Sequence, residues 1–568
     1  MPSSLPFDIT NAFYVSFNFV VNDKLHTFNA TLTFAPGKLP ELTFINQDDA
    51  FNWHRLPNSI EEIACYDMAS NQVFHLYDNK RYSEQIVPIF IISNFDHTVG
   101  SIKKIRCELE GVSQWYCQQS SFNFTSDTPS KLEREEIPSV EYQFEIDDKK
   151  YFFELHHQAT LSHSILADSN VQLKDIAAIY LTPVSNEVDP RSIVDLLHDI
   201  RMLFSLLLGY CVNLQHVEVF NDKKQKMAFY YPTPDDNFPQ IRWYGEYLTT
   251  PSFFIQFAKE ILTNFFTAKR NIFLTCWYRY IALSSQSHFI EYELLTYLTI
   301  LDGYVSYRAK ELEQKCSDKK YDELLSDLSS VLESYKKSSP EDSLAFQAWI
   351  DKIDTAMLGE KFPATSLVTL KDKFKAVLGT YPKEATTVFL KNSEIQRIIV
   401  DDRNDIAHGR EAKSSLDKLN HRLHTVKSVL AFFAFSDLGI SPRDFLKQYS
   451  VSHHPIKHHK AFNQVALDRY LGTVPFFHVS NSDYDYLSQN KERTVVLHKK
   501  KDKYEFLPEE TKATQAWPKN NDGIRQVADY VQQKVITKPG LKASYVGTPY
   551  IVSKRRQPHQ LFQVIVIE

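Results

Sequence analysis

The sequence predicts a multidomain α+β protein with a β-rich N-terminal domain, an all-α domain and a small mixed α/β C-terminal region. Three observations support this fold class. At 568 residues and 66.0 kDa, the chain is longer than one hydrophobic core usually organises. Apolar residues alternate with polar ones in the first part and recur at helical spacing in the middle. After Pro442 the pattern changes again, so we place the domains at residues 1–245, 250–440 and 455–568.

The first domain reads as antiparallel β-structure, with a sandwich as its expected architecture up to about residue 160. From Phe13 to Phe19, apolar residues alternate with polar ones, and Asn22-Asp23 supplies a turn before a second alternating run. Residues 144–149, with Asp147-Asp148 at the centre, are typical of another hairpin tip. The most apolar run of the chain, around residues 202–214, is too short for a membrane span. It overlaps the helix expected from Ser192 to about Tyr210, so we expect a buried helix there.

Helical periodicity begins near Thr250 and predicts helices over residues 253–268, 271–283 and 288–311. The domain closes with a long amphipathic helix that Gly439 terminates. Its apolar face repeats at spacings of three and four residues, through Leu416, Leu419, Leu423, Val426, Leu430 and Phe433.

A short polar motif precedes that helix: Arg403-Asn404-Asp405-Ile406-Ala407-His408-Gly409. A guanidinium that binds phosphate and an imidazole that titrates near neutral pH are suited to metal-free RNA cleavage. With 20 Arg and 20 His in the chain, chance alone gives about 0.7 pairs at this spacing, and two occur. The second pair, Arg493 and His498, encloses a β-branched run that predicts a strand, so we interpret it as a coincidence.

The first motif resembles the R-x4-H motif of HEPN-domain ribonucleases. A β-rich domain followed by a helical domain that carries R-N-x3-H is also similar to the ApeA family of phage-defence proteins, over roughly residues 1–440. The resemblance implies an all-α HEPN-like domain and catalytic roles for Arg403, Asn404 and His408. Asp405 and Asp302 are its supporting residues, although Asp302 stands where Glu is commoner and is followed by Gly303.

The expected activity is that of a metal-independent RNA endonuclease in antiviral defence or abortive infection, with 2′,3′-cyclic phosphate and 5′-OH products. The resemblance implies RNA as the partner, tRNA as the first substrate to test, and a phage-derived trigger. The N-terminal domain is then expected to sense or regulate. The alternative is a non-catalytic HEPN scaffold that binds RNA or a protein.

The motif spacing also bears on assembly. Positions five apart on a regular helix differ by about 140°, so Arg403 and His408 do not share a face unless the helix end unwinds. A site completed across a symmetric interface is the other reading. It agrees with the resemblance, because HEPN domains commonly dimerise with their motifs facing each other. We therefore expect a homodimer or a higher even oligomer.

The composition gives further expectations. Six scattered cysteines form no C-x-x-C pair, and the N-terminus shows no signal peptide, so a cytoplasmic protein with reduced thiols and no membrane contact is expected. From Val451 onward 18 Lys/Arg stand against 11 Asp/Glu, a net +7 on a chain of net −6. Two basic stretches there are either RNA-binding or solvated surface: Lys499, Lys500 and Lys501, and Lys554, Arg555 and Arg556.

No cofactor and no metal site is predicted. The run His453-His454-Pro455-Ile456-Lys457-His458-His459 has imidazole ligands, but no nearby Cys or acidic pair completes a site. A polar interdomain linker is the preferred interpretation of this run.

Overall fold

The computed structural model divides the chain into two compact units, each described here by itself. Unit 1 comprises residues 1–380 and 392–461, and unit 2 comprises residues 381–391 and 462–568. The structure describes residues 11–21, 23–35, 38–45, 56–82, 85–94, 98–117, 122–124, 132–134, 137–163, 171–184, 187–232, 239, 241, 243–283, 289–312, 330, 370–390, 406, 415–457, 462–490, 492–515, 517, 526–536, 540–554 and 556–568.

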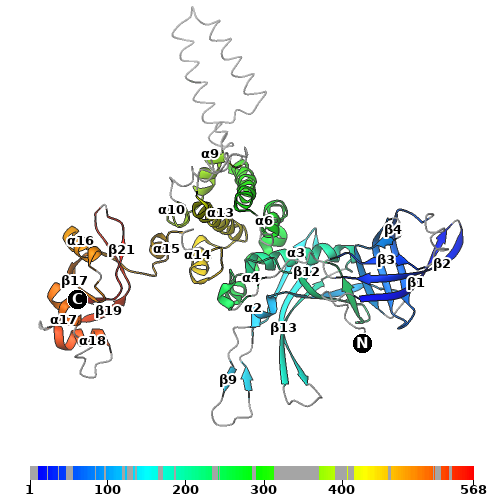
Figure 1. Ribbon diagram of the computed structural model, residues 1–568, viewed down its shortest axis with the longest axis horizontal. Coiled ribbons are helices and arrows are strands. Elements are labelled where there is room, and N and C mark those ends of the chain that lie inside the picture. The colour runs from blue at the N-terminus through cyan, green and yellow to red at the C-terminus, as the bar shows by residue number, and fades with distance from the viewer. Residues whose placement is uncertain are drawn as a thin grey trace, which may run out of the picture. The chain divides into compact units, whose positions relative to one another are not determined.

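The N-terminal part of unit 1 is built on one antiparallel sheet (Figure 1). Its thirteen strands are β1 (Asn11–Val21), β2 (Lys24–Phe34), β3 (Glu41–Phe44), β4 (Ser59–Asp67), β5 (Val73–Tyr82), β6 (Gln85–Val87), β7 (Phe90–Asn94), β8 (Ile102–Leu109), β11 (Val140–Ile146), β12 (Lys149–His163), β13 (Val171–Pro183), β14 (Leu214–Asn221) and β15 (Lys226–Tyr230). β9 (Phe122–Phe124) pairs with β10 (Leu132–Arg134) in a separate hairpin. Both predicted hairpins are confirmed, with Asp23, Asp147 and Asp148 at positive φ in their turns.

The expected sandwich is wrong, because the first six strands close on themselves into a barrel-like sheet in the order β5-β4-β1-β2-β3-β6-β5. β5 makes this closure possible by using two partners along one edge. Residues up to Tyr77 pair with β7, and residues from Lys80 pair with β6. Asp78, between them, has φ +53 and accepts a hydrogen bond from Arg191 Nε at 2.9 Å. An irregular residue of this kind bends a strand, so β5 can leave one partner and join another.

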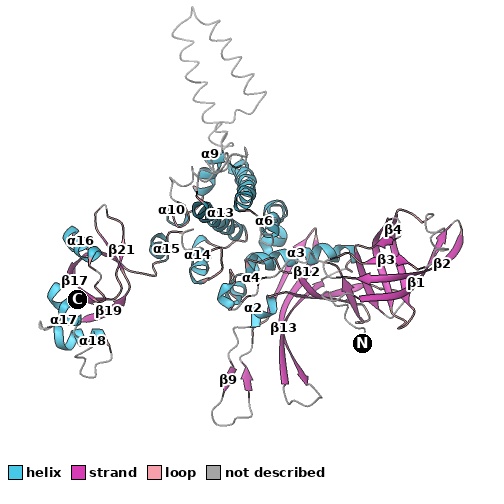
Figure 2. Cartoon of the chain, viewed as in Figure 1, coloured by secondary structure: helices cyan, strands magenta, loops and turns pink. Residues whose placement is uncertain are grey.

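The other half of the sheet, β11-β12-β13-β8-β14-β15, is open and carries helices on one face. The helices are α2 (Val112–Cys117), α3 (Pro190–Leu208) and α4 (Pro251–Thr263), with the short η1 (Tyr244–Glu246) before α4 (Figure 2). Trp115 of α2 is fully buried and its indole Nε1 donates to the Thr249 carbonyl at 2.7 Å. The predicted helix from Ser192 is confirmed as α3, and the apolar run is buried core within it up to Leu208.

A helical region follows the sheet, as predicted, and it belongs to the same compact unit as the sheet. Its helices are α4, η2 (Asn264–Ala268), α5 (Arg270–Ile272), η3 (Phe273–Trp277), α6 (Tyr278–Leu283), residues 290–312, α9 (Leu370–Leu378), α13 (Leu416–Asp437) and α14 (Pro442–Val451). η2 and η3 are π-helical, a form that sequence periodicity does not reveal. Gly439 ends α13 with φ +86, which a glycine adopts without strain.

Unit 2 mixes helices and strands, as expected of the C-terminal region. Its elements are α10 (Lys383–Thr386), α15 (Gln464–Leu471), β16 (Phe476–His478), α16 (Asn481–Gln489), β17 (Val495–Lys500), β18 (Lys503–Phe506), α17 (Pro508–Gln515), α18 (Val527–Tyr530), η6 (Val531–Val535), β19 (Ala543–Gly547), β20 (Tyr550–Val552), β21 (His559–Gln560) and β22 (Val564–Ile567). One sheet has the order β16-β20-β21 and the other β18-β17-β22-β19.

The structure bears on two further features of the chain, its candidate membrane spans and its cysteines. Among the described residues, no helix combines the length and the apolar character needed to cross a bilayer. The five cysteines in the described ranges are buried free thiols, and burial raises the pKa of Cys107 to about 12.

Candidate functional site

The motif residues Arg403, Asn404, Asp405 and His408 lie outside the described residues, as does Arg555. Within the motif, Ile406 is described, and it is helical and half-buried. The structure therefore defines the scaffold on either side of the motif.

Helix α13, which begins eight residues after His408, is the centre of the helical region. Tyr304 stacks on Phe433 at 5.0 Å between ring centroids, and Phe435 packs on Phe445 at 5.1 Å. Five of the six predicted stripe residues are buried, but Leu416 is 66% exposed because it sits in the first turn. The second half of α13 is buried on nearly every side.

Asp302 lies on the helix of residues 290–312, and Gly303 does not interrupt that helix. The Asp302 carboxylate accepts a hydrogen bond from Ser306 Oγ at 3.3 Å, and Lys373 Nζ donates to the same Ser306 Oγ at 3.1 Å. Asp302 is thus half-buried within a polar chain that links this helix to α9.

A buried carboxylate that sequence reasoning missed lies at the last residue of α13. Asp437 is 4% exposed, and the Trp277 indole Nε1 donates to its Oδ2 at 3.0 Å. Burial raises the pKa of Asp437 to about 6, and the nearby Arg308 guanidinium opposes that rise. The available signal was an acidic residue in the last turn of an apolar helix, where the helix dipole disfavours negative charge.

Asp437 should make the stability of unit 1 depend on pH. Its folded pKa of about 6 lies above the ordinary 3.8, so its favourable contribution is full below about pH 4 and is lost as the pH rises through 6. That rise corresponds to about 3 kcal/mol over the whole window. Asp437→Asn cannot titrate, so melting temperatures measured from pH 4.5 to 7.5 should favour the variant increasingly as the pH rises. A difference that stays constant with pH would contradict this assignment.

The N-terminal sheet contacts the helical region through the β11–β12 hairpin. Phe144 stacks on Phe266 of η2 at 4.1 Å, and Thr267 Oγ1 donates to the Glu145 carbonyl at 2.7 Å. An open cleft of about 330 Å³ lies beside this contact, lined by the hairpin tip, η2, α5 and residues Tyr307 and Glu311. The hairpin therefore joins the sheet to the π-helical segment of the helical region.

A buried ion pair forms a second junction. Arg270 of α5 donates to Asp199 Oδ2 at 2.6 Å, and Tyr278 donates to Asp199 Oδ1. Burial raises the pKa of Asp199, while Arg270 and Tyr278 act in the opposite direction. Because Asp199 belongs to α3, this pair ties the helical cover of the sheet to the helical region.

The face of the open half-sheet away from its helices carries a network of charges. Arg106 lies 2.6 Å from Glu108 on its own strand, β8, and 3.3 Å from Glu218 on the neighbouring β14. Burial opposes ionisation of Glu218, but hydrogen bonds with His216 and Lys226 outweigh it and lower its pKa to about 2. On the same sheet, Glu141, Glu154 and His156 are the group of described residues whose donor atoms are close enough to share a metal ion.

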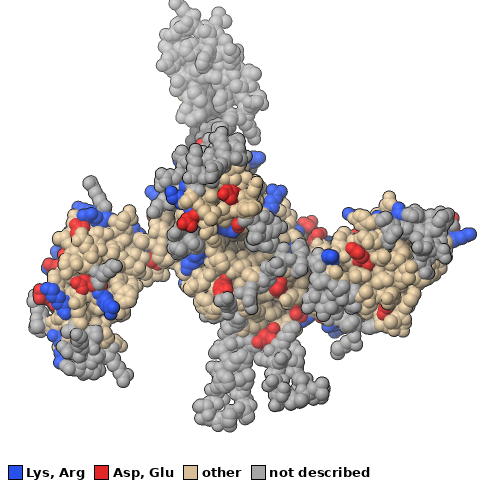
Figure 3. All heavy atoms as spheres, in the orientation of Figure 1, with Lys and Arg blue, Asp and Glu red and all other residues tan. Residues whose placement is uncertain are grey.

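The basic C-terminal stretches are partly neutralised. Lys499 pairs with Glu568 at 2.9 Å, Lys500 with Glu505, and Arg556 with Asp485 at 3.0 Å. Within the described part of unit 2, neither Lys501, at the β17–β18 turn, nor Lys554 forms an ion pair. Figure 3 accordingly shows basic and acidic atoms interspersed over this unit.

The pairing predicts unequal contributions to RNA binding. Affinity for RNA falls as the salt concentration rises. Replacing Lys501 and Lys554 by alanine should make the plot of log affinity against log salt less steep, by about 0.7 for each lysine that contacts a phosphate. The matched change of Lys499 and Lys500 should lower it less, because carboxylates already compensate these two lysines. Filter binding of single-stranded RNA across a salt series measures both slopes. Two unchanged slopes would mean that these stretches are solvated surface.

The second R-x4-H pair has the predicted strand environment. Arg493 is exposed before β17, and His498 lies within β17 opposite Glu505 of β18. His498 is thus part of a regular, paired strand that begins two residues after Arg493, which agrees with the interpretation of this pair as a coincidence.

The histidine run is not a simple polar linker where it is described. His454 is buried, contacts the Gly209 carbonyl through Nε2 at 3.1 Å, and packs on Tyr210 at 4.4 Å. Burial lowers the pKa of His454 to about 3, so this ring is neutral. His453 packs on Trp243, whereas His458 and His459 lie outside the described residues.

Comparison with known proteins gives one match. Residues 13–268 match the family model described as ApeA N-terminal domain 1. No curated protein and no solved structure matches the chain. The match covers the sheet from Phe13 onward and continues through α4 and η2.

Proposed function

We propose, from the ApeA-type N-terminal region, that this chain is a metal-independent RNA endonuclease of the HEPN type that acts in defence against phage. One observation supports this most. In the same unit, the region that matches ApeA N-terminal domain 1 is followed by a helical region whose central helix begins eight residues after R-N-x3-H. A tRNA is the proposed substrate, because its exposed loops present reachable phosphates.

The proposed chemistry assigns each motif residue a task. His408 exchanges a proton with the RNA 2′-hydroxyl or with the leaving 5′-oxygen. Arg403 binds the scissile phosphate and stabilises its developing negative charge. Asn404 positions the phosphate or the imidazole, while Asp405 and Asp302 support these groups. The products are a 2′,3′-cyclic phosphate and a 5′-hydroxyl.

The N-terminal region is proposed to restrain the nuclease until a phage-derived trigger appears. Two junctions support this role: the hairpin contact between Phe144 and Phe266, and the ion pair between Asp199 and Arg270. Both junctions converge on residues 264–278, which lead through Trp277 to Asp437 at the end of α13. A change at the sheet therefore has a packed route to α13, the helix that follows the motif in the sequence.

Incubation of the pure protein with total tRNA in EDTA tests the proposal. The expected result is cleavage into fragments with 2′,3′-cyclic phosphate ends, which polynucleotide kinase with phosphatase activity identifies. The alternative, a non-catalytic scaffold that binds RNA or a protein, predicts RNA retention without fragments. Because activity awaits a trigger, the same assay is repeated with protein purified from phage-infected cells. Intact tRNA in both preparations would leave the scaffold as the better description.

The active form is expected to be a dimer or a larger even assembly, because the 140° offset between Arg403 and His408 favours a site completed by a second copy. Mass photometry at the concentration used for cleavage measures this directly. A catalytically active monomer would show that the helix end unwinds instead.

A further inference from the structure

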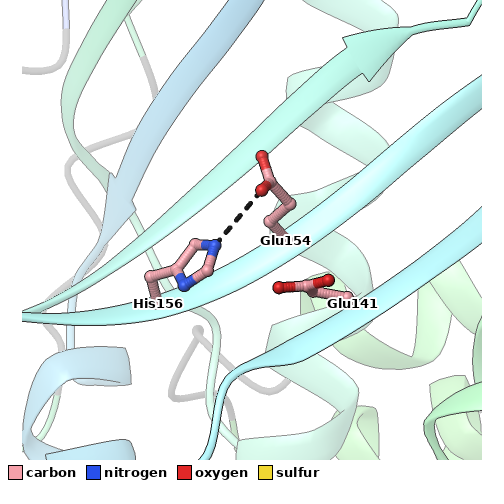
Figure 4. A group of neighbouring side chains, drawn as sticks. All are labelled: Glu141, Glu154 and His156. Atoms are coloured by element: carbon pink, nitrogen blue, oxygen red, sulfur yellow. Dashed lines mark hydrogen bonds and ion pairs between the residues drawn. The ribbon is translucent and has the colours of Figure 1, made fainter.

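The open half-sheet carries three potential metal ligands on two neighbouring strands. Glu141 of β11 stands directly opposite Glu154 of β12, and His156 follows Glu154 by two residues on the same face. Figure 4 shows the three side chains converging, with the imidazole directed at the Glu154 carboxylate. Their donor atoms all lie within 4.8 Å of one another, so one ion can reach all three.

The hydrogen bonds around Glu154 orient it as a ligand. Its Oε1 lies 3.3 Å from His156 Nε2, and its Oε2 accepts a hydrogen bond from Lys104 Nζ at 3.0 Å. Burial opposes ionisation of Glu154, but the bonds from Lys104 and His156 outweigh it and lower the pKa of this carboxyl. Lys104 thus binds one carboxylate oxygen of Glu154, and the other oxygen faces the His156 imidazole. In metal sites, residues that do not bind the metal commonly orient its ligands in this way.

The charges of the cluster are not balanced by the protein itself. Like charges directly opposite each other on an antiparallel pair are destabilising. Lys104 forms its ion pair with Glu154, and within the described ranges Glu141, whose side chain is exposed, forms none. Without the imidazole, the two carboxylates and one ammonium leave a net charge of −1, which favours an added cation.

We propose that Glu141, Glu154 and His156 bind a divalent first-row metal ion, with zinc as the ion to test. One imidazole and two carboxylates form a donor set that suits such ions, with water completing the coordination. The ion joins β11, the edge strand of the sheet, to β12. The same hairpin contacts η2 through Phe144, so the metal braces the strand by which the sheet reaches the helical region. This role is separate from the proposed RNA chemistry.

Isothermal titration of the EDTA-stripped full-length protein with Zn²⁺, in the absence of RNA, tests the site. Wild-type protein should bind one equivalent that Glu141→Gln and His156→Gln lose, or bind at least about tenfold more weakly. The matched control is Glu62→Gln, because Glu62 contacts His75 at 3.2 Å in a pair to which no third donor contributes among the described residues. The Glu62→Gln control should bind as many zinc ions as the wild-type protein, because any zinc bound by other histidines is the same in both proteins.

A second variant distinguishes loss of the ligand from loss of the fold. Glu141→Lys places a cation opposite Glu154, so it should lose the zinc equivalent and yet melt at or above the wild-type temperature without metal. Hydrogen exchange should also show that zinc slows the amides of β11 in wild-type protein but not in Glu141→Lys. Equal zinc stoichiometry and affinity in wild type, Glu141→Gln and His156→Gln would overturn the site. None of these measurements depends on RNA cleavage, so the test of the zinc site can be interpreted even if the nuclease proposal fails.

Discussion

His408→Ala should abolish RNA cleavage and toxicity while the fold stays intact, and Arg403→Ala should do the same. Loss of a general acid–base group costs about 10² to 10⁴ in rate, and loss of the phosphate-binding guanidinium removes charge stabilisation in the transition state. Both residues lie in the sequence before α13, which begins eight residues after His408, and neither belongs to the buried half of that helix. RNA gels report the rate, and far-UV circular dichroism reports the fold.

The second R-x4-H pair supplies the matched control. Arg493→Ala and His498→Ala change the same residue types at the same spacing, but Arg493 precedes β17 and His498 lies within that paired strand of unit 2. Both variants should retain wild-type cleavage. A folded His408→Ala protein that cleaves at full rate would refute the catalytic assignment, and so would equal losses in the two pairs.

The second large effect is expected at the buried ion pair between the sheet's helical cover and the helical region. Asp199→Ala should lower the melting transition of unit 1 by the equivalent of about 3 kcal/mol or more, because Arg270 is then left without its carboxylate partner. The Asp199 side chain is 4% exposed and that of Arg270 19%, so water compensates little of the loss. Differential scanning calorimetry of the full-length protein measures the shift.

An exposed ion pair of the same part of the chain separates burial from charge. Lys103 and Glu187 lie 3.6 Å apart, with side chains 45% and 61% exposed. Glu187→Ala should therefore change stability by no more than about 1 kcal/mol. Equal melting shifts for Asp199→Ala and Glu187→Ala would mean that the buried ion pair with Arg270 stabilises unit 1 no more than an exposed one does.

Local periodicity determined much of the secondary structure. The alternation from Phe13 to Phe19 predicted β1, because side chains on a strand point to opposite faces in turn. The spacing from Leu419 to Phe433 predicted the buried face of α13, because residues three and four apart lie on the same side of an α-helix. The pair Asp147-Asp148 marked a hairpin tip, because Asp tolerates the positive φ that both residues adopt in the turn. These features depend on neighbouring residues, so the sequence alone specifies them.

Tertiary structure alone decided which distant segments meet. β8, at residues 102–109, pairs between β13 and β14, and β6 closes the first strands onto β5. The same long-range pairing brings Lys104 to Glu154, and helix packing brings Trp277 to Asp437. Arg403 and His408 were recognisable because a motif is a local pattern. Glu141, Glu154 and His156 were not, because their proximity exists only in the register of two paired strands, which the periodicity of either strand alone does not encode.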